Sequence, residues 1–511
     1  MPVSLLSVAP AWLAPLCLAL ALSGCGGLRT ATAPPALPGG LPTEWAGASA
    51  DSPPATTPKA LLAWWQQFND PLLTDLVRQA LAANTGVRSA QAALRQARAL
   101  QDVAAAGLGP TLTAGADAQR ARSAGNTGNR FGASLDASWE LDLFGGRRSA
   151  LDARSASAEA SAADLGTVQV SLAAEVALAY IGLRNAQGRV AIAEANLASQ
   201  QETLQIVRWR QQAGLADGLA TAQALAAAEQ TRAVLPLLQT TVAQSRHALA
   251  VLTGQPPAAL DTRLANAKPV PQPAATLALA GPADTLRQRP DVRAAERRLA
   301  AAWATLDQAD AALRPSLRLG GSLGLSALTL SGLGQSAAVA GSLLAGLSLP
   351  VFDGGALRGQ QRAQQAALDQ AQQAWHASVL TALQEVEDAL VALANDQARQ
   401  QRLQAAAQAA TNAATLAGQR YRSGLVDFQT VLDTQRSQLA AQDSLAGASA
   451  DIAAAHVRLY KSLGGGWVDD LATTGTTTET TTAATTAATT AAATAASTRA
   501  GTPASIPTGT P

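Results

Sequence analysis

The chain has 511 residues and a formal net charge of +1, with 14% charged and only 3% aromatic residues. A typical soluble domain has about 25% charged residues, so the composition is unusual for a set of globular domains. The near-neutral charge argues against a nucleic-acid partner, which needs a basic surface. The core must be built mostly from small aliphatic side chains, which suits closely packed long helices.

The N-terminus predicts a lipoprotein signal peptide over residues 1–24. A mostly apolar stretch, Leu5–Leu22, is followed by a serine and a glycine directly before Cys25. Small residues before a cysteine are typical of a lipoprotein cleavage box, so we expect Cys25 to be acylated. Residue Gly26 is not aspartate, so the inner-membrane retention signal is absent and sorting to the outer membrane is expected. The alternative is an ordinary secretory signal or an uncleaved anchor.

Residues 25–58 are rich in Pro, Ala, Gly and Thr, which predicts a lipidated tether. A helical pattern follows over 61–106. Within it Asp70 is a candidate N-cap, because Pro71 suits the first turn of a helix.

The sequence period then changes from that of a helix to that of a strand. Polar and apolar residues alternate over about 110–122 and again over about 131–143, on either side of a Gly/Asn-rich turn at 125–129. One face of the second stretch carries Leu135, Ala137, Trp139, Leu141 and Leu143. The pattern predicts a hairpin with one apolar and one polar face.

A proline-free stretch over about 147–213 predicts one helix of about 100 Å, at 1.5 Å per residue. The same order of elements then recurs. Strands are expected over about 315–328 and 338–352, followed by a long helix over about 356–422.

Matching residues lie 205 positions apart before the hairpins and 210 positions apart after them. Examples are the pairs Val87 and Val292, then Gly214 and Gly424. The chain is therefore predicted to be an internal duplication.

The repeats are expected over 59–257 and 282–470, and a Thr/Ala-rich disordered tail over 471–511. Four amphipathic strands are too few to close a transmembrane barrel, which has at least about eight. Open sheet edges are not tolerated in a bilayer, so the chain must oligomerise, and three copies would supply twelve strands.

Seven motifs carry a resemblance to a known family, and together they span residues 61–467 in family order. They are Trp64-Trp65 with Phe68-x-Asp70-Pro71, Trp139 to Gly145, Glu175-Val176-Ala177 with Tyr180, Arg289-Pro290-Asp291-Val292-Arg293-x-x-Glu296, Glu385 to Leu390, Arg420-Tyr421-x-x-Gly424, and Leu459 to Trp467.

With these motifs the chain resembles the outer-membrane efflux proteins, the TolC-like duct family, and most of all their lipidated NodT subfamily. The resemblance implies an α+β membrane protein that trimerises into a 12-stranded transmembrane β-barrel on a periplasmic α-helical barrel. It implies a passive exit duct for small molecules. The implied partners are outer-membrane lipid, a periplasmic adaptor and an inner-membrane transporter of the resistance-nodulation-division type.

The resemblance also places a periplasmic aperture at the helix tips. Asp433 falls where the family has an acidic ring, with Asp427 nearby, and Tyr421 falls where relatives latch the closed tip. The tip turns contain Gly214, Asp217 and Gly424. From the residues alone, the glycines are expected to end helices and the aspartates to cap the next ones.

The residue inventory argues against an enzyme. The three histidines are single, both cysteines lie within the first 25 residues, and we find no phosphate-binding or nucleophile motif, so no catalytic group, metal or cofactor is expected. Other interpretations remain open. The duct could serve protein secretion or metal-ion export, or the chain could be a trimeric coiled-coil scaffold without a pore.

Overall fold

The computed structural model describes residues 42–47, 61–123, 126–273, 281–335 and 339–467. The chain divides into two compact units, Met1–Gly40 and Leu41–Pro511, and every described residue belongs to the second. The predicted signal peptide, Cys25, most of the tether and the C-terminal tail lie outside the described residues.

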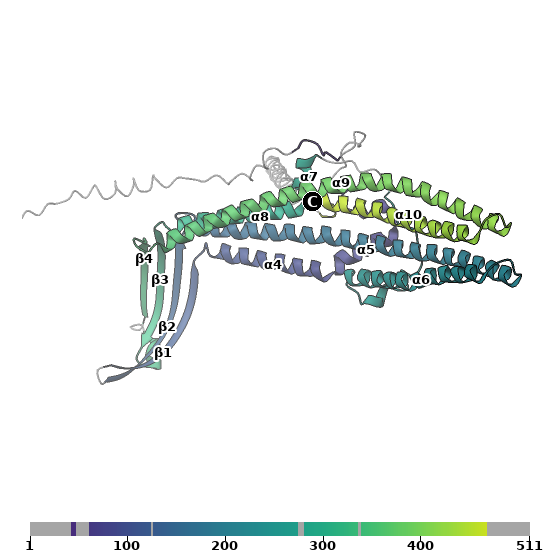
Figure 1. Cartoon of the computed structure of the whole chain (residues 1–511). Coiled ribbons are helices and arrows are strands. Elements are labelled where there is room, and N and C mark those ends of the chain that lie inside the picture. Colours follow the sequence, from purple (N-terminus) through teal and green to yellow (C-terminus); the bar gives the residue numbers. More distant parts are fainter. Residues whose placement is uncertain (1–41, 48–60, 124–125, 274–280, 336–338, 468–511) are drawn as a thin grey trace, which may run out of the picture. The chain divides into compact units, whose positions relative to one another are not determined.

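The two halves of the chain contain the same series of elements (Figure 1). The first half comprises η1 (Trp64–Phe68), α3 (Pro71–Ala83), α4 (Thr85–Ala106), β1 (Thr111–Ser123), β2 (Asn126–Leu141), α5 (Gly146–Gln212), α6 (Gly218–Leu252) and η2 (Pro257–Leu260). The second half comprises α7 (Pro282–Gln288), α8 (Pro290–Ala311), β3 (Ser316–Ala327), η3 (Leu330–Gly334), β4 (Val339–Ser348), α9 (Ala356–Arg422) and α10 (Phe428–Ser462).

The expected helical stretch over 61–106 is three elements, not one. Asn69, in the left-handed region at φ 51°, ends η1, and Asp70 caps α3 by accepting hydrogen bonds from the backbone N–H groups of Leu72 and Leu73 at 2.8 and 3.3 Å. The Asn84 side chain caps α4 by accepting from the N–H of Gly86 at 2.8 Å. The Asp70-Pro71 pair indicates the first break, but the helical period hides the second, because a polar capping residue such as Asn84 also fits the exposed face of a helix.

The long helices of the two halves have equal lengths. Helices α5 and α9 each span 67 residues, and α6 and α10 each span 35. Helix α5 contacts α3, α4, α6, α8 and α10, while α9 contacts α8 and α10. Among the described helices, α5 is the one long and apolar enough to cross a membrane by length and composition. Half of its most apolar stretch is buried in the protein, as expected of a core helix.

The four strands form one antiparallel sheet in the order β1-β2-β3-β4. The register places apolar residues opposite one another: Leu112 pairs with Ala137, and Leu135 pairs with Leu323. These side chains, and Leu343 on β4, therefore share one face of the sheet. Most of the large apolar side chains on it are exposed in the single chain, Leu343 to 94%.

The strand ends differ from those expected at two places. Strand β2 begins at Asn126 and not near 131, because Thr127 and Gly128 continue the pairing with β1 where a turn was expected. Strand β4 ends at Ser348 and not near 352. Pro350 follows and has no backbone N–H to donate to a ladder.

The duplication is visible in matching hydrogen bonds at the helix ends. The Asn84 side chain donates to the carbonyl of Leu252 at 2.9 Å, and 205 positions later Arg289 donates to the carbonyl of Ser462 at 2.8 Å. Leu252 and Ser462 are 210 positions apart. Each half is thus closed by a side chain that binds the end of its last helix.

The main apolar core lies where η1 and α3 meet α5 and α10. Trp64 is fully buried in this core and stacks on Tyr460, with ring centroids 5.1 Å apart. Tyr180 of α5 donates from its hydroxyl to Asp70 at 2.6 Å.

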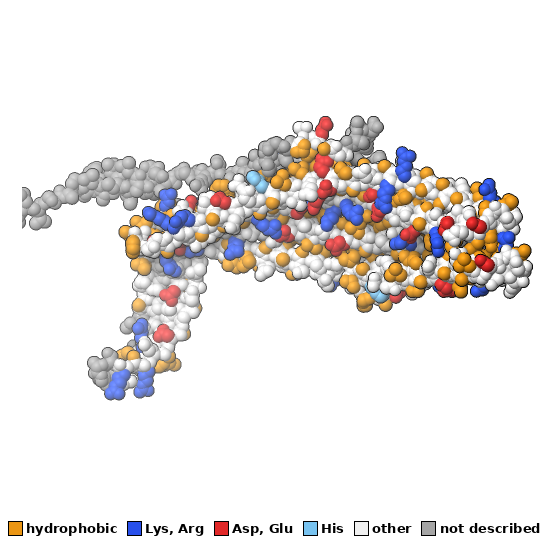
Figure 2. All heavy atoms as spheres, in the orientation of Figure 1, with side chains coloured by type: hydrophobic (Ala, Val, Ile, Leu, Met, Phe, Trp, Pro, Cys, Tyr) orange, Lys and Arg blue, Asp and Glu red, His pale blue; other side chains and the backbone are white. Residues whose placement is uncertain are grey.

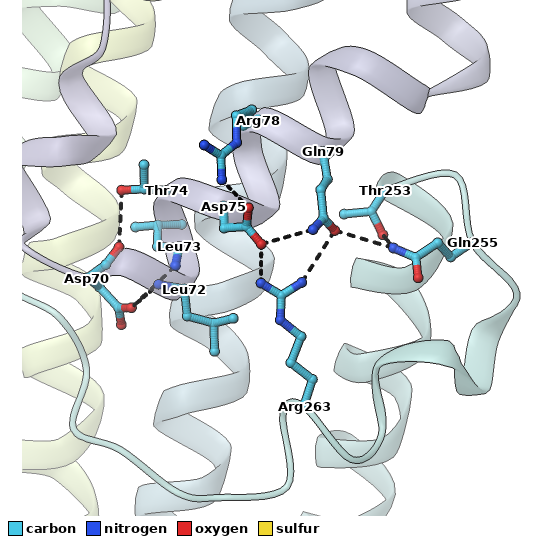
Figure 3. A network of polar contacts seen from close by, with 10 residues as sticks. All are labelled: Asp70, Leu72, Leu73, Thr74, Asp75, Arg78, Gln79, Thr253, Gln255 and Arg263. Carbon is cyan, nitrogen blue, oxygen red and sulfur yellow. Dashed lines mark hydrogen bonds and ion pairs between the residues drawn. The ribbon is translucent and has the colours of Figure 1, made fainter.

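A polar network ties α3 to the loop after α6 (Figure 3). Asp75 pairs with both Arg78 and Arg263, and the Gln79 amide donates to Asp75 at 2.9 Å. The hydrogen bonds and charges of the two arginines hold the pKa of the Asp75 carboxyl below its ordinary value. The network fixes the first-half loop beside the core.

Candidate functional site at the helix tips

The two turns that join the long helices have the same backbone conformation. Gly214 and Gly424 have φ of 72° and 76°, in the left-handed region that glycine adopts without steric cost. The residue after each glycine donates its backbone N–H to the carbonyl five positions earlier. Leu215 donates to Arg210 at 2.7 Å, and Leu425 donates to Arg420 at 2.9 Å. Both turns are Schellman caps, so the glycines end helices as expected.

The aspartates of both turns cap the following helices, also as expected. Asp217 accepts from the N–H of Ala220 at 2.9 Å. Asp427 accepts from the hydroxyl of Thr430 at 2.6 Å and from its N–H at 2.9 Å. These two hydrogen bonds lower the pKa of the Asp427 carboxyl.

Tyr421 lies at the end of α9, in a small apolar cluster near the tips. It is buried, and its ring meets that of Phe428 edge-on, with centroids 5.8 Å apart. Arg210 of α5 crosses to it from the other half of the chain. The guanidinium lies 4.6 Å from the centre of the tyrosine ring and donates to the Tyr421 carbonyl at 2.8 Å. Arg210 thus joins the two hairpins near their tips, in addition to the apolar cluster, which also contains Leu204 and Val207 of α5.

Arg210 is the last of four polar residues that follow α5 at seven-residue spacing. Arg189 binds Asp443 through two hydrogen bonds of 2.5 and 2.9 Å, and the Asn196 amide donates to Gln442 at 2.8 Å. Thr203 accepts from Gln435 at 3.0 Å.

We call these four contacts the polar seam: Arg189–Asp443, Asn196–Gln442, Thr203–Gln435 and Arg210–Tyr421. A heptad position that faces a partner helix is usually apolar. Polar residues there fix the register of the pair and make it weaker than an apolar interface. The polar seam therefore fixes the register of α5 against the second half of the chain.

Asp433 lies one and a half turns into α10 and is exposed. Its carboxylate accepts from the Gln429 amide at 3.0 Å and lies 3.9 Å from Arg436, both on the same helix. The described contacts of Asp433 therefore leave its carboxylate open to solvent, beside the tip but outside the Tyr421 cluster.

The polar face of the sheet is the second candidate surface. Arg318 of β3 donates to the Ser138 hydroxyl of β2 at 3.0 and 2.9 Å, and Ser322 and Ser342 share a hydrogen bond of 2.7 Å. Figure 2 shows a sheet face that is mostly white, with a few acidic side chains and basic ones at the end away from the helices. This face is hydrophilic, while the opposite one is apolar.

An ion-pair cluster joins the start of α8 to the middle of α9. Arg289 is buried and contacts both Asp291 and Glu385 at 2.6 Å. Burial, the largest single influence, raises the pKa of the Asp291 carboxyl, but the hydrogen bond and charge of Arg289 outweigh it and lower the pKa overall. Glu385 thus ties α9 to the start of α8, whereas its counterpart Glu175 is exposed.

The structure brings together some predicted residues and adds others. Tyr421, Gly424 and Asp427 share the second tip, and Gly214 and Asp217 share the first. Apart from Tyr421, the seam residues were not predicted, although the spacing of 189, 196, 203 and 210 is visible in the sequence. Among the described residues, no group of three or more His, Cys, Asp or Glu side chains is placed to hold a metal ion.

Comparisons with known proteins identify the family. A family model described as outer membrane efflux protein matches residues 76–255 and 281–465. The pyoverdine export outer membrane protein OpmQ of Pseudomonas putida is 37% identical over 481 residues, which cover 91% of this chain and 99% of that protein. Nodulation protein T of Rhizobium leguminosarum bv. viciae is 32% identical over 457 residues, covering 89% of this chain and 93% of that protein.

A solved structure agrees. The outer-membrane channel OprN matches with a TM-score of 0.79 at 38% identity, over 84% of this chain and 98% of that one. The resemblance and the fold class expected from the sequence, four strands and long helices that trimerise into a 12-stranded barrel on a helical barrel, are confirmed. The chain belongs to the outer membrane efflux protein family and is an outer-membrane channel component of an efflux pump.

Proposed function

We propose that three copies of this chain form a passive, non-enzymatic exit duct whose aperture lies at the helix tips. The two-faced sheet is the observation that carries this proposal. Its apolar face is exposed in the single chain, and its other face carries Arg318 and hydrogen-bonded serines. In a barrel shared by three chains, the first face would contact lipid and the second would line water.

The duct would receive its cargo from a periplasmic adaptor and an inner-membrane transporter of the resistance-nodulation-division type. The length of the helices supports this arrangement, because the 67 residues of α5 rise about 100 Å from the sheet. The cargo would be small organic molecules. A relative named for pyoverdine export supports this cargo over secreted protein or metal ions.

Cys25 would be the acylated first residue of the mature chain. An acyl chain contributes about 0.8 kcal/mol per buried methylene, so several chains would add a firm anchor to the barrel. The repeats over 59–257 and 282–470 would then be tethered to the membrane by residues 25–58.

The tips would form the gate. Arg210 joins the two hairpins of one chain at Tyr421, and the polar seam continues this contact along α5. Opening would separate α5 from α9 at the tip and then from α10 along the rest of the seam. Asp433, exposed beside the tip, would meet its two copies near the threefold axis, where three carboxylates favour cations.

The proposal is tested by deleting the gene in its native host, in a background without other ducts. Dye retention and drug susceptibility are then measured with the wild-type gene or Cys25→Ser restored. We expect deletion to raise dye retention and sensitivity, and the wild-type gene to reverse both. The Cys25→Ser result reports the contribution of the anchor. Unchanged dye retention and sensitivity would contradict small-molecule efflux and favour secretion or metal export.

A further inference from the structure

The apolar face of the sheet carries two basic side chains at one end. Strand β1 begins shortly after α4 and β2 ends shortly before α5, so the turn between the two strands is the end of the sheet away from these helices. Near this turn β1 carries Arg120 and Arg122, which we call the arginine pair. Both follow Leu112 at an even number of positions, so they lie on the apolar face with it, and both are exposed.

Across the four described strands, the arginine pair is the only charge on the apolar face. The register places every other charged strand residue on the polar face: Asp117, Arg130, Asp136, Glu140 and Arg318. Arg130, for example, pairs with Gln119 and donates to the Ser326 hydroxyl at 3.2 Å. Figure 2 shows basic side chains at this end of the sheet. No acidic strand residue therefore shares a face with the arginine pair to neutralise it.

The second half of the chain lacks this pair. At the offset of 205 positions that relates β1 to β3, Arg120 corresponds to Leu325. Arg122 corresponds in the same way to Ala327. Both counterparts are apolar, like the rest of that face. The positive charge is thus an addition to the first hairpin, and a trimer would carry three such pairs.

The height of the arginine pair follows from the length of the apolar band. On β2 the band runs over ten positions from Leu141 to Phe131, with Trp139 near its lower end. Ten positions span about 34 Å, and a strand tilt of about 40° makes the band about 26 Å tall, close to the apolar band of a transmembrane barrel. The partners of Arg120 and Arg122 lie two and four positions beyond Phe131. The pair therefore lies about 5–10 Å above the band.

We propose that Arg120 and Arg122 bind the phosphate groups of lipid A, the phosphorylated glycolipid of the outer leaflet. This rests on the shared barrel proposed above, because in that barrel the apolar face meets lipid. The helices of this family form a periplasmic tunnel, so the turn end of the sheet faces the outside of the cell. The pair thus lies at the level of the lipid head groups.

The chemistry of the pair selects the phosphate. A guanidinium group can donate two parallel hydrogen bonds to phosphate oxygens. The Cα atoms of Arg120 and Arg122 are about 7 Å apart along one face of the strand, so both side chains can reach one phosphate. The acyl chains of the same lipid would pack on the apolar band below, beside Leu112 and Leu135.

Binding of diphosphorylated lipid A to the purified, detergent-solubilised trimer tests the proposal, measured by native mass spectrometry. We expect the double variant Arg120→Ala/Arg122→Ala to bind about 30-fold more weakly than the wild type, because each arginine near a lipid surface contributes about fivefold. Arg130→Ala is the matched control. It removes the same charge from the same hairpin but on the polar face, and should keep the wild-type affinity. Changing both arginines of the pair to lysine should give an intermediate affinity, since lysine keeps the charge without the planar fork.

Two further arms identify the chemical group that is bound. Lipid A without its phosphates should bind the wild type and the double variant equally. Inorganic phosphate at the same concentration as lipid A should not displace it, because the acyl chains add contacts that phosphate lacks.

Equal affinity of the wild type and the double variant for lipid A would overturn the proposal. So would equal affinity of the wild type for lipid A with and without phosphates, or displacement by inorganic phosphate alone. A trimer that fails in any of these ways leaves the proposed duct intact, because binding is measured without transport. A wild-type chain that forms no trimer would contradict both the duct and the lipid site.

Discussion

Replacing Arg210 with alanine should open the helix tips. In the wild type its guanidinium donates to the Tyr421 carbonyl at 2.8 Å and lies 4.6 Å from the centre of the tyrosine ring. The donated hydrogen bond also places a positive charge at the C-terminal end of α9, where the helix dipole favours it. Alanine removes all three interactions and leaves the apolar packing of the Tyr421 cluster, which also contains Leu204 and Val207 of α5.

The size of the effect follows from the geometry. A hydrogen bond from a charged donor contributes about 1.5–3 kcal/mol when buried, and Arg210 is only partly buried, so about 1 kcal/mol is reasonable here. The contact with the ring adds about 0.5 kcal/mol at an exposed site. Each chain would lose about 1.5 kcal/mol of closed-state stability. If three tips open together, the ratio of closed to open forms falls by about three orders of magnitude.

Single-channel recording in planar bilayers measures this change as a longer open time and a larger mean conductance. Arg208→Ala is the matched control, because it removes the same charge from an exposed position two residues away. Arg210→Lys should have an intermediate effect, since lysine keeps the charge but not the planar stacking. Tyr421→Phe should resemble the wild type, because the contact uses the ring and the backbone carbonyl. Equal conductance for Arg210→Ala and Arg208→Ala would show that the Arg210 contact does not hold the tips closed.

Three further predictions concern the aperture and the fold. Asp433→Asn should reduce the preference of the pore for cations, measured as a smaller reversal potential in a KCl gradient. The control Asp369→Asn, on α9, should leave the reversal potential unchanged. An unchanged reversal potential in Asp433→Asn would exclude an acidic ring. Gly424→Ala should lower the free energy of unfolding by about 1 kcal/mol, because φ is 76° there, whereas Gly418→Ala inside α9 should raise it by about 0.5 kcal/mol. The pKa of Asp291 is lowered in the folded chain, so its ion pair stabilises the fold above the ordinary value of 3.8 and is lost as pH falls through the lowered pKa. As pH falls below about 4, the urea midpoint of unfolding should therefore fall less in Asp291→Asn than in the wild type. An equal fall in both proteins would show that the Asp291 ion pair does not contribute to the acid sensitivity.

Local and periodic features of the structure could be predicted from the sequence. The Asp70-Pro71 pair marked a capped helix start, and the 205 and 210 offsets indicated two equivalent halves with equally long helices. The alternation around Trp139 predicted which strand residues share a face. The helix cap and the strand alternation depend on neighbouring residues, and the duplication depends on a fixed offset, so all three can be seen in the sequence without knowing which helices pack together.

Contacts between the halves could not be predicted in the same way. Arg189 and Asp443 are 254 positions apart, and their pairing depends on α5 lying beside α10. Amphipathic pattern alone does not select that neighbour among several long helices. The break at Asn84 was missed for a different reason, since asparagine is equally acceptable on the exposed face of a continuous helix.

If three copies of this chain enclose a pore that the tips close, the purified protein should conduct ions in planar bilayers. Conductance is recorded for the wild type and Arg210→Ala side by side. We expect discrete channel steps from a trimer, rare or brief in the wild type and sustained in Arg210→Ala. A folded trimer that gives no conductance in either form would contradict a pore and favour a coiled-coil scaffold.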